Sequence, residues 1–203
     1  QPRSRGLGDV YKRQGLKLLL LSFCVAFAAC SVQSPSVQVS DKGTKWSWDK
    51  GTIVVETPER PAGQTSVIGL TAPKIEAVRV GFVGLGMRGP SAVERFTYIP
   101  GVEIVALCDY EQERAEKCQR FLKKASMPKA AVYSGEKGYE ELCKRDDIDL
   151  VYIATDWLHH SPVAVCAMEN GKHVAIEVPS AMSLEECWAL IDLSETTRKH
   201  CMI

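Results

Sequence analysis

The chain has 203 residues, of which 45% are hydrophobic and 25% are charged. Its 25 Lys and Arg residues balance 25 Asp and Glu residues, so the formal net charge is zero. Such a composition is typical of an ordinary globular protein. It argues against a nucleic-acid-binding protein, because those proteins use clustered Lys and Arg to neutralise phosphates. Small molecules are therefore the favoured partners.

The two ends of the chain indicate a piece of a longer protein. The first Met is Met87, and the sequence stops at Ile203, where a new apolar strand begins. Residues 1–14 show no hydrophobic periodicity and resemble a translated sequencing adaptor, so we interpret them as an artefact. We expect a C-terminal α/β substrate domain to be missing from this fragment.

Residues 15–30 have the pattern of an export signal. Lys17 precedes an apolar run, 18–29, that is too short to span a bilayer and fits a signal peptide. The run ends in Phe27-Ala28-Ala29-Cys30, which resembles a bacterial lipobox. We therefore predict an exported lipoprotein in the periplasm, outer membrane or cell surface, held on the membrane only by lipidated Cys30. A plain cleaved signal and a buried helix are the alternatives.

Residues 31–75 are typical of a tether followed by an N-terminal arm. Positions 31–40 are rich in Ser, Gln, Pro and Val and have little to bury. The arm is expected to be irregular, with one short strand at Thr52–Glu56. Trp46 and Trp48 favour packing of the arm against a domain, and stacking on a sugar is the alternative.

A glycine motif opens the remaining segment, 76–203. The β-forming run Val78–Val83 leads into Gly84-x-Gly86-x-x-Gly89 and then into a helical pattern. Gly84 permits a tight turn, Gly86 lets the backbone approach a pyrophosphate, and Gly89 lets the helix pack on the strand. The helix N-terminus then faces the anion, so the motif predicts dinucleotide binding.

An acidic residue at the end of the second strand supports this prediction. The strand 102–108 ends in Asp109, which lies 20 residues beyond Gly89. An acid at this position hydrogen-bonds the adenosine ribose and would repel a 2′-phosphate. Because no Arg immediately follows it, NAD is favoured over NADP. Asp109 is also suited to cap the helix that begins at Glu111, and the two roles are compatible.

The rest of the segment alternates between helical and strand patterns. Ser183 and Glu186 have the spacing of a capping box that starts the last helix. The alternation predicts an α/β fold with a Rossmann-type doubly wound parallel sheet, here truncated. Helices are expected at 91–97, 111–125, 138–145, 163–169 and 184–199, and further strands at 130–133, 150–154, 172–177 and 200–203.

The loop 155–162 is expected to face the cofactor crevice, because ligands bind beyond the carboxyl ends of parallel strands. His159 and His160 within it are candidate ligands, acid/base groups or packing residues at a helix start. No other His or carboxylate lies at a metal-binding spacing, so no metal site is predicted. Asp146 and Asp147 are interpreted as a solvated turn rather than an acid/base pair.

Six cysteines follow Cys30 and lie mostly at apolar positions of predicted helices and strands. None forms a Cys-x-x-Cys pair or a metal-binding pattern, so most are predicted to be small buried hydrophobic residues. An exported domain is able to form disulfides, but the sequence indicates no pairing. The six are Cys108, Cys118, Cys143, Cys166, Cys187 and Cys201.

These features together resemble the nucleotide-binding half of the Gfo/Idh/MocA oxidoreductases. The resemblance rests on the glycine motif, Ala154-Thr155 with His160-x-Pro162, and Gly171–Val174 followed by Glu177-x-Pro179. Dehydrogenases of that family typically carry Glu-Lys-Pro, whose lysine moves the substrate hydroxyl proton. The middle residue here is Val178, which carries no transferable proton.

The finer pattern resembles glycoside hydrolase family 109, the NAD-dependent α-N-acetylgalactosaminidases. It is carried by 84–90, 154–160, 176–179 and the arm segment 51–61. The resemblance implies a glycan substrate with terminal α-N-acetylgalactosamine, cleaved through oxidation at C3, elimination, water addition and reduction. A sugar dehydrogenase of the same superfamily and a non-catalytic binding protein with this fold are the alternatives.

The resemblance also assigns roles to individual residues. It implies that the catalytic residues lie mainly downstream of Ile203 and that the fragment is therefore inactive. A homo-oligomer is compatible with the resemblance. Met87 and Arg88 would contact the pyrophosphate, and Asp109 would contact the adenosine ribose. The crevice on the nicotinamide side would be lined by Trp157, Leu158, His159 and His160. Glu177 and Val178 would lie beside the nicotinamide.

Overall fold

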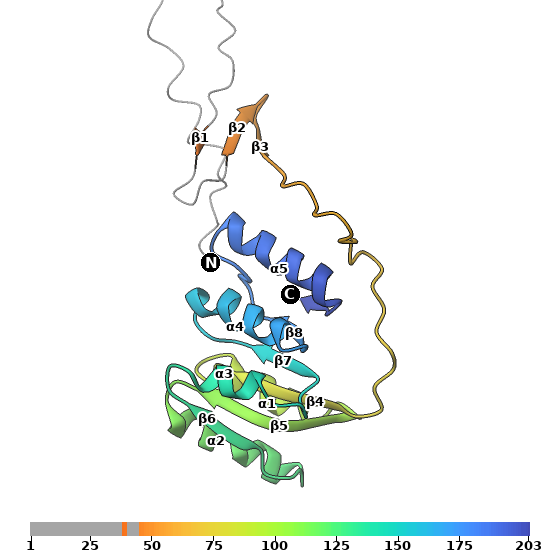
Figure 1. The fold of residues 1–203 in the computed structure, drawn as a ribbon. Helices are drawn as coiled ribbons and strands as arrows, with labels where there is room; N and C mark the ends of the chain where they lie inside the picture. Colours follow the sequence, from red (N-terminus) through yellow and green to blue (C-terminus); the bar gives the residue numbers. More distant parts are fainter. Residues whose placement is uncertain (1–37, 40–44) are drawn as a thin grey trace, which may run out of the picture. The chain divides into compact units, whose positions relative to one another are not determined.

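The computed structural model describes residues 38–39 and 45–203 (Figure 1). The predicted adaptor, the export signal with Cys30, and most of the predicted tether lie outside these residues. The described residues form a small antiparallel sheet near their beginning and a six-stranded parallel sheet after it. None of the helices in the described part is long and apolar enough to cross a membrane.

The small sheet contains three strands, β1 (Gln38–Val39), β2 (Lys45–Asp49) and β3 (Thr52–Val55). The strand predicted at 52–56 is confirmed, but the expectation of an otherwise irregular arm is wrong for β2, and β1 lies at the end of the predicted tether. Lys50 and Gly51 both have left-handed backbone angles, with φ of 47° and 82°, which suits a tight two-residue hairpin turn. Trp46 and Trp48 lie on one face of β2 and pack edge to face, with ring centroids 6.3 Å apart.

The large sheet confirms the predicted doubly wound fold. Its six strands are all parallel and lie in the order β6-β5-β4-β7-β8-β9, so the strand order reverses between β4 and β7. The strands are β4 (Val78–Val83), β5 (Val102–Asp109), β6 (Ala131–Ser134), β7 (Leu150–Ile153), β8 (His173–Ile176) and β9 (Cys201–Met202).

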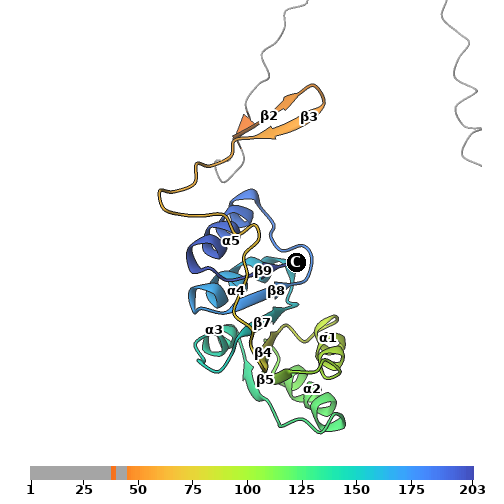
Figure 2. The ribbon, with the colours of Figure 1, turned by 90° about the vertical axis from the view of Figure 1, so that its right-hand side faces the viewer.

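Helices cover both faces of this sheet (Figure 2). One face carries α1 and α2, and the other carries α3, α4 and α5, with a separate apolar cluster on each side. The helices are α1 (Gly89–Phe96), α2 (Gln112–Lys124), α3 (Gly138–Cys143), α4 (Trp157–Glu169) and α5 (Leu184–Thr197).

The central strand β4 connects the two apolar clusters. Val80 and Phe82 point to the cluster under α1 and α2, whereas Val83 belongs to the cluster under α3 to α5. Phe82 meets Phe96 of α1 edge to face, with centroids 5.2 Å apart. Because both faces are covered, β4 is apolar throughout its second half, as buried parallel strands usually are.

The start of α4 differs from the sequence prediction. The helix was expected at 163–169 and begins instead at Trp157, so most of the predicted loop 155–162 is helical. Asp156 is the N-cap, and its side chain accepts a hydrogen bond from Leu158 N. Pro162 lies inside the helix, which explains why the sequence suggested a later start. The Ser183 N-cap of α5 is confirmed, since its hydroxyl accepts from Glu186 N.

The cysteine prediction holds only in part. Cys108, Cys118 and Cys143 are buried, Cys166 and Cys201 are half-buried, and Cys187 is exposed. All six of these cysteines are free thiols. Cys187 lies on the outer side of α5, where the apolar pattern of the helix did not reveal its exposure.

The arm is attached to α5 by charged and polar contacts. Arg60 donates two hydrogen bonds to the carboxylate of Glu195, at 2.8 and 2.9 Å. Gln64 also donates to Glu195, at 2.9 Å, and Arg198 donates to the carbonyl of Thr65. The Glu195 side chain is only 3% exposed, so these contacts satisfy a carboxylate that is otherwise withdrawn from water.

The stability of this attachment should depend on pH. Hydrogen bonds from Arg60 and Gln64 lower the pKa of the Glu195 carboxyl below its ordinary value of 4.5. A depressed folded-state pKa adds stability that is present above the unfolded pKa and lost as pH falls through the folded pKa. We therefore expect Arg60→Ala to lower the thermal midpoint at pH 7, with the difference from wild type shrinking below about pH 4.5.

Circular dichroism at a series of pH values measures this effect. Lys74→Ala is the matched control, because Lys74 pairs with Glu76 while both side chains are more than four-fifths exposed. Identical midpoints for wild type and Arg60→Ala at pH 7 would contradict the role assigned to the ion pair.

Candidate functional site

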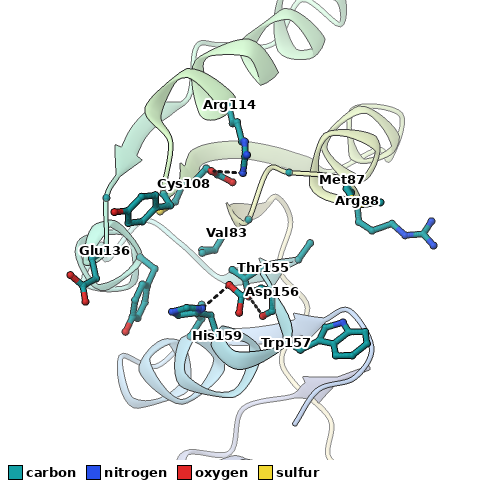
Figure 3. Close-up of a pocket in the computed structure, with 18 residues that line it drawn as sticks. Val83, Met87, Arg88, Cys108, Arg114, Glu136, Thr155, Asp156, Trp157 and His159 are labelled. Carbon is teal, nitrogen blue, oxygen red and sulfur yellow. Dashed lines mark hydrogen bonds and ion pairs between the residues drawn. The ribbon is translucent and has the colours of Figure 1, made fainter. Parts of the chain in front are cut away.

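A cavity of about 810 Å³ lies beyond the carboxyl ends of the parallel strands (Figure 3). Its walls come from the glycine loop after β4, the ends of β5 and β6, and the beginning of α4. It therefore lies at the switch point between β4 and β7, where doubly wound sheets bind their ligands. The size is that of a pocket for a small organic molecule.

The glycine loop is held against the ends of two neighbouring strands. Gly84 N donates to Cys108 O at 2.9 Å, and Gly84 has a left-handed φ of 91°. A Cβ at Gly84 would lie 2.4 Å from the backbone carbon of Ala154. A Cβ at Gly89 would lie 1.9 Å from Gly84 O. Only glycine fits either position, which confirms the physical reason for the motif.

Gly86 is different, because no protein backbone crowds it. The nearest atom to a Cβ there would be Arg114 Nη1, at 3.7 Å. The structure thus leaves open space beside Gly86 on the cavity side. Close approach of a ligand, rather than packing within the protein, is what a glycine at this position allows.

Asp109 combines burial with a position on the cavity wall. Its side chain is 6% exposed, Oδ2 accepts from Leu85 N at 2.6 Å, and Oδ1 accepts from Glu111 N at 3.0 Å. The predicted helix cap at Asp109 is wrong in detail, because Glu111 is the N-cap of α2 and Asp109 bonds to the backbone N–H of that cap residue. Each carboxylate oxygen has a second lone pair, so Asp109 retains capacity to accept from ribose hydroxyls.

The start of α4 forms the opposite wall. Asp156, Trp157 and His159 line the cavity, and His159 Nδ1 lies 2.7 Å from Asp156 Oδ2. Burial opposes ionisation of Asp156, yet the hydrogen bond and charge of His159 lower the pKa of this carboxyl below its ordinary 3.8. Figure 3 shows the two side chains joined by a dashed line.

Of the residues assigned from the sequence, seven line this one cavity. The remaining five lie around it in other environments. The seven are Gly84, Gly86, Met87, Arg88, Asp109, Trp157 and His159, and the five are Gly89, Leu158, His160, Glu177 and Val178.

Three of those five, His160, Glu177 and Val178, lie at or contact the segment after β8. His160 is buried, and its Nδ1 lies 2.7 Å from Pro179 O, while Nε2 has no hydrogen-bond partner. Glu177 accepts a hydrogen bond from Tyr152 OH at 2.7 Å. Burial and Glu177 together raise the pKa of Tyr152 to about 12, so the phenol stays protonated and donates. Leu158 and Val178 are exposed.

The sequence did not single out several residues of the cavity wall. Tyr110 and Glu136 follow β5 and β6, Tyr139 lies on α3, and Arg114 reaches the cavity from α2. Position directly after a parallel strand was the available signal for Tyr110. Nothing in the sequence spacing of Arg114 indicated that its side chain points toward the cavity.

Cys108 also lines the cavity. Burial raises the pKa of its thiol to about 12, so this residue is not a thiolate nucleophile.

The residues present fit a dinucleotide. The crowded Gly84 and Gly89 make the tight turn, the open Gly86 admits a pyrophosphate, and the α1 N-terminus faces it. Asp109 provides the ribose acceptor beside this loop. Among residues 38–39 and 45–203, no group of three or more His, Cys, Asp or Glu side chains is placed to hold a metal ion. The fold and site therefore define a dinucleotide-binding domain.

Comparison with known families identifies the domain. The Gfo/Idh/MocA family model, described as an oxidoreductase family with an NAD-binding Rossmann fold, matches residues 78–203. The chain belongs to this family, and its cofactor is NAD. The predictions of fold class, family resemblance and cofactor are confirmed.

Curated relatives of the chain carry a glycosidase name. A "Glycosyl hydrolase family 109 protein 4" from Phocaeicola vulgatus is 75% identical over 189 residues, covering 93% of this chain and 37% of that protein. A "Glycosyl hydrolase family 109 protein 1" from Bacteroides thetaiotaomicron is 58% identical, covering 92% and 39%. The chain thus spans less than two fifths of the length of these relatives.

Solved structures with the same domain bind nicotinamide cofactors. A myo-inositol dehydrogenase from Lactobacillus casei, in complex with NAD(H) and myo-inositol, is 28% identical with a TM-score of 0.52, covering 59% of this chain and 34% of that chain. A biliverdin reductase from Synechocystis, in complex with biliverdin and NADP+, is 27% identical with a TM-score of 0.52, covering 61% and 36%.

Two glycine substitutions should separate folding from cofactor binding. Gly89→Ala drives a methyl group into Gly84 O, so we expect it to destabilise the fold by about 1–3 kcal/mol. Gly86→Ala meets open space, so we expect stability within about 0.5 kcal/mol of wild type. Its NAD affinity should nevertheless fall about tenfold or more, because the methyl group occupies the ligand's side of the loop.

Urea unfolding without cofactor and calorimetric titration with NAD measure the two effects. A Gly86→Ala variant that binds NAD as well as wild type would contradict close approach at this position. A Gly89→Ala variant of unchanged stability would contradict the packing role.

Proposed function

We propose that the protein to which this chain belongs is an NAD-dependent glycosidase that removes terminal α-N-acetylgalactosamine from glycans. The names of its relatives support a glycosidase, and the family supports NAD as the cofactor. The observation that carries the proposal is Val178. It is 69% exposed at the carboxyl end of β8, where dehydrogenases of this family typically place a lysine.

In the proposed reaction, C3 of the sugar is oxidised, the C1 leaving group is eliminated, water is added, and C3 is reduced again. Bound NAD supplies the hydride acceptor and donor for this cycle. The net change is hydrolysis, so no second redox substrate is required. This differs from the usual two-carboxylate route of glycosidases.

The chain's own residues bind and position the reactants. The glycine loop and the α1 N-terminus hold the pyrophosphate, and Asp109 accepts from the ribose hydroxyls. The hydrogen bond from Tyr152 fixes Glu177 at the end of β8, and buried His160 contacts the neighbouring Pro179 carbonyl. Val178 carries no transferable proton, so in this proposal other residues transfer protons to and from the sugar.

Export as a lipoprotein is part of the proposal. The support is the sequence pattern of 15–30 with Cys30 at its end. An enzyme that regenerates its bound NAD in each turnover does not need the free NAD of the cytosol, which suits an exported protein. Labelling of the expressed protein with a radioactive fatty acid, lost in Cys30→Ala, tests the anchor.

The full-length protein should release p-nitrophenol from p-nitrophenyl α-N-acetylgalactosaminide only when it retains NAD. In deuterated water the product should acquire deuterium at C2, because the elimination removes that proton. The 203-residue chain alone should be inactive. Net formation of NADH with a sugar, without glycoside cleavage, would instead establish a dehydrogenase. Failure to retain any nicotinamide cofactor would favour a binding protein.

Asp109→Ala should weaken NAD binding about 10- to 100-fold, because it removes hydrogen bonds between a charged acceptor and the ribose. Activity should fall and recover in part when NAD is added. Asp147→Ala is the control, since this exposed acid pairs with Arg145 away from the cavity. Unchanged cofactor occupancy in Asp109→Ala, measured by absorbance after denaturation, would refute the ribose assignment.

A further inference from the structure

Arg114 occupies a corner of the cofactor cavity that the family match leaves unexplained. It lies in the first turn of α2, its side chain is 46% exposed, and it lines the cavity. Nη1 is 3.6 Å from Asp109 Oδ1 and 3.7 Å from where a Gly86 Cβ would be. Figure 3 shows the side chain pointing from its helix toward the cavity. The guanidinium thus lies between the glycine loop and the ribose acceptor.

A second acid holds this guanidinium. Glu111 Oε1 lies 2.9 Å from Arg114 Nη2, and the Glu111 side chain is 55% exposed. Arg114 is therefore shared between Asp109 on one side and Glu111 on the other. With two carboxylates and one guanidinium, the group carries one net negative charge.

The sign of that charge affects which group the site accepts at the 2′ position of the adenosine ribose. NAD and NADP differ at the adenosine 2′ position, which in NADP carries a phosphate, and the ribose lies beside Asp109. A carboxylate repels a phosphate, whereas an arginine binds it through two parallel hydrogen bonds. Asp109 and Arg114 therefore act in opposite directions on the same group. Which one dominates depends on how much of Arg114 is already engaged.

We propose that the Glu111–Arg114 ion pair sets how strongly this site rejects NADP. While Glu111 engages the guanidinium, the carboxylate of Asp109 governs the 2′ position and NAD is preferred. Without Glu111, Arg114 turns to the 2′-phosphate and the preference relaxes. This inference rests on the cofactor site alone, so it stands or falls independently of the glycosidase activity.

A competing role for Arg114 is contact with the pyrophosphate, since Nη1 also lies close to Gly86. The two roles give different results, because the pyrophosphate is common to both cofactors and the 2′-phosphate is not. The ratio of the NADP dissociation constant to the NAD dissociation constant distinguishes them.

The experiment compares this ratio, by calorimetric titration of the full-length protein, in wild type, Glu111→Gln, Arg114→Gln and the double variant. Glu111→Gln should lower the ratio about three- to tenfold by strengthening NADP binding. Arg114→Gln should raise it. The double variant should match Arg114→Gln, because Glu111 acts through Arg114. Higher salt should diminish the Glu111→Gln effect, since the charges are partly exposed.

Glu113→Gln is the matched control on the same helix. Glu113 pairs with Lys117 at 2.8 Å, both side chains are mostly exposed, and neither lines the cavity. This variant removes the same charge as Glu111→Gln and should leave the ratio unchanged. Thermal unfolding without cofactor verifies that each variant is folded.

Three outcomes would overturn the inference. Equal weakening of NAD and NADP by Arg114→Gln would make Arg114 a pyrophosphate contact. A Glu111→Gln effect that persists in the Arg114→Gln background would show that Glu111 acts without Arg114. If Glu113→Gln shifted the ratio of dissociation constants as much as Glu111→Gln, the loss of one negative charge anywhere on the helix would explain the effect.

Discussion

The close backbone approach at Gly84 is the constraint on which the rest of the domain depends. Gly84 contacts the end of β7 on one side and the start of α1 on the other, at distances that leave no room for a side chain. Its N–H also bonds to the end of β5. Three strands and one helix therefore meet at a single residue, and the cavity lies at this point because the strand order reverses there.

Much of this arrangement could be predicted from the sequence, because local patterns encode it. The glycine spacing, the acid at position 109 and the alternation of apolar runs gave the sheet and the cofactor edge. The start of α4 was missed because Pro162 suggested a break, whereas the Asp156 cap decides the boundary. The position of the Arg114 side chain at the cavity was missed because it follows from the packing of α2 on the sheet, which the spacing of residues in the sequence does not encode. Strand β2 was missed because its pairing with β3 depends on a Lys-Gly turn rather than a stronger turn signal.

The end of β8 is supported by partly buried polar contacts. Tyr152 contacts Phe82 and Phe96 in the apolar cluster, with centroids 5.3 Å apart in each case, and its hydroxyl reaches Glu177. His160 contacts the Pro179 carbonyl from the second turn of α4. These two contacts flank Val178, and the backbone on each side of it is held by the bond from Glu177 N to Ile153 O and by the His160 contact with Pro179 O. A substitution at Val178 therefore changes the chemistry of the exposed side chain while its position is held by neighbours.

The contact between Arg60 and Glu195 has a practical consequence for where the domain can be cut. The family match begins at residue 78, yet the nearly buried carboxylate on α5 finds its partners at 60 and 64, more than 125 residues earlier. An expression boundary placed at the first strand of the parallel sheet would remove the hydrogen bonds that Arg60 and Gln64 donate to that carboxylate. A boundary that keeps these contacts lies ahead of Arg60, so the segment from Arg60 to the first strand of the parallel sheet is a part of the fold that the family alignment does not include.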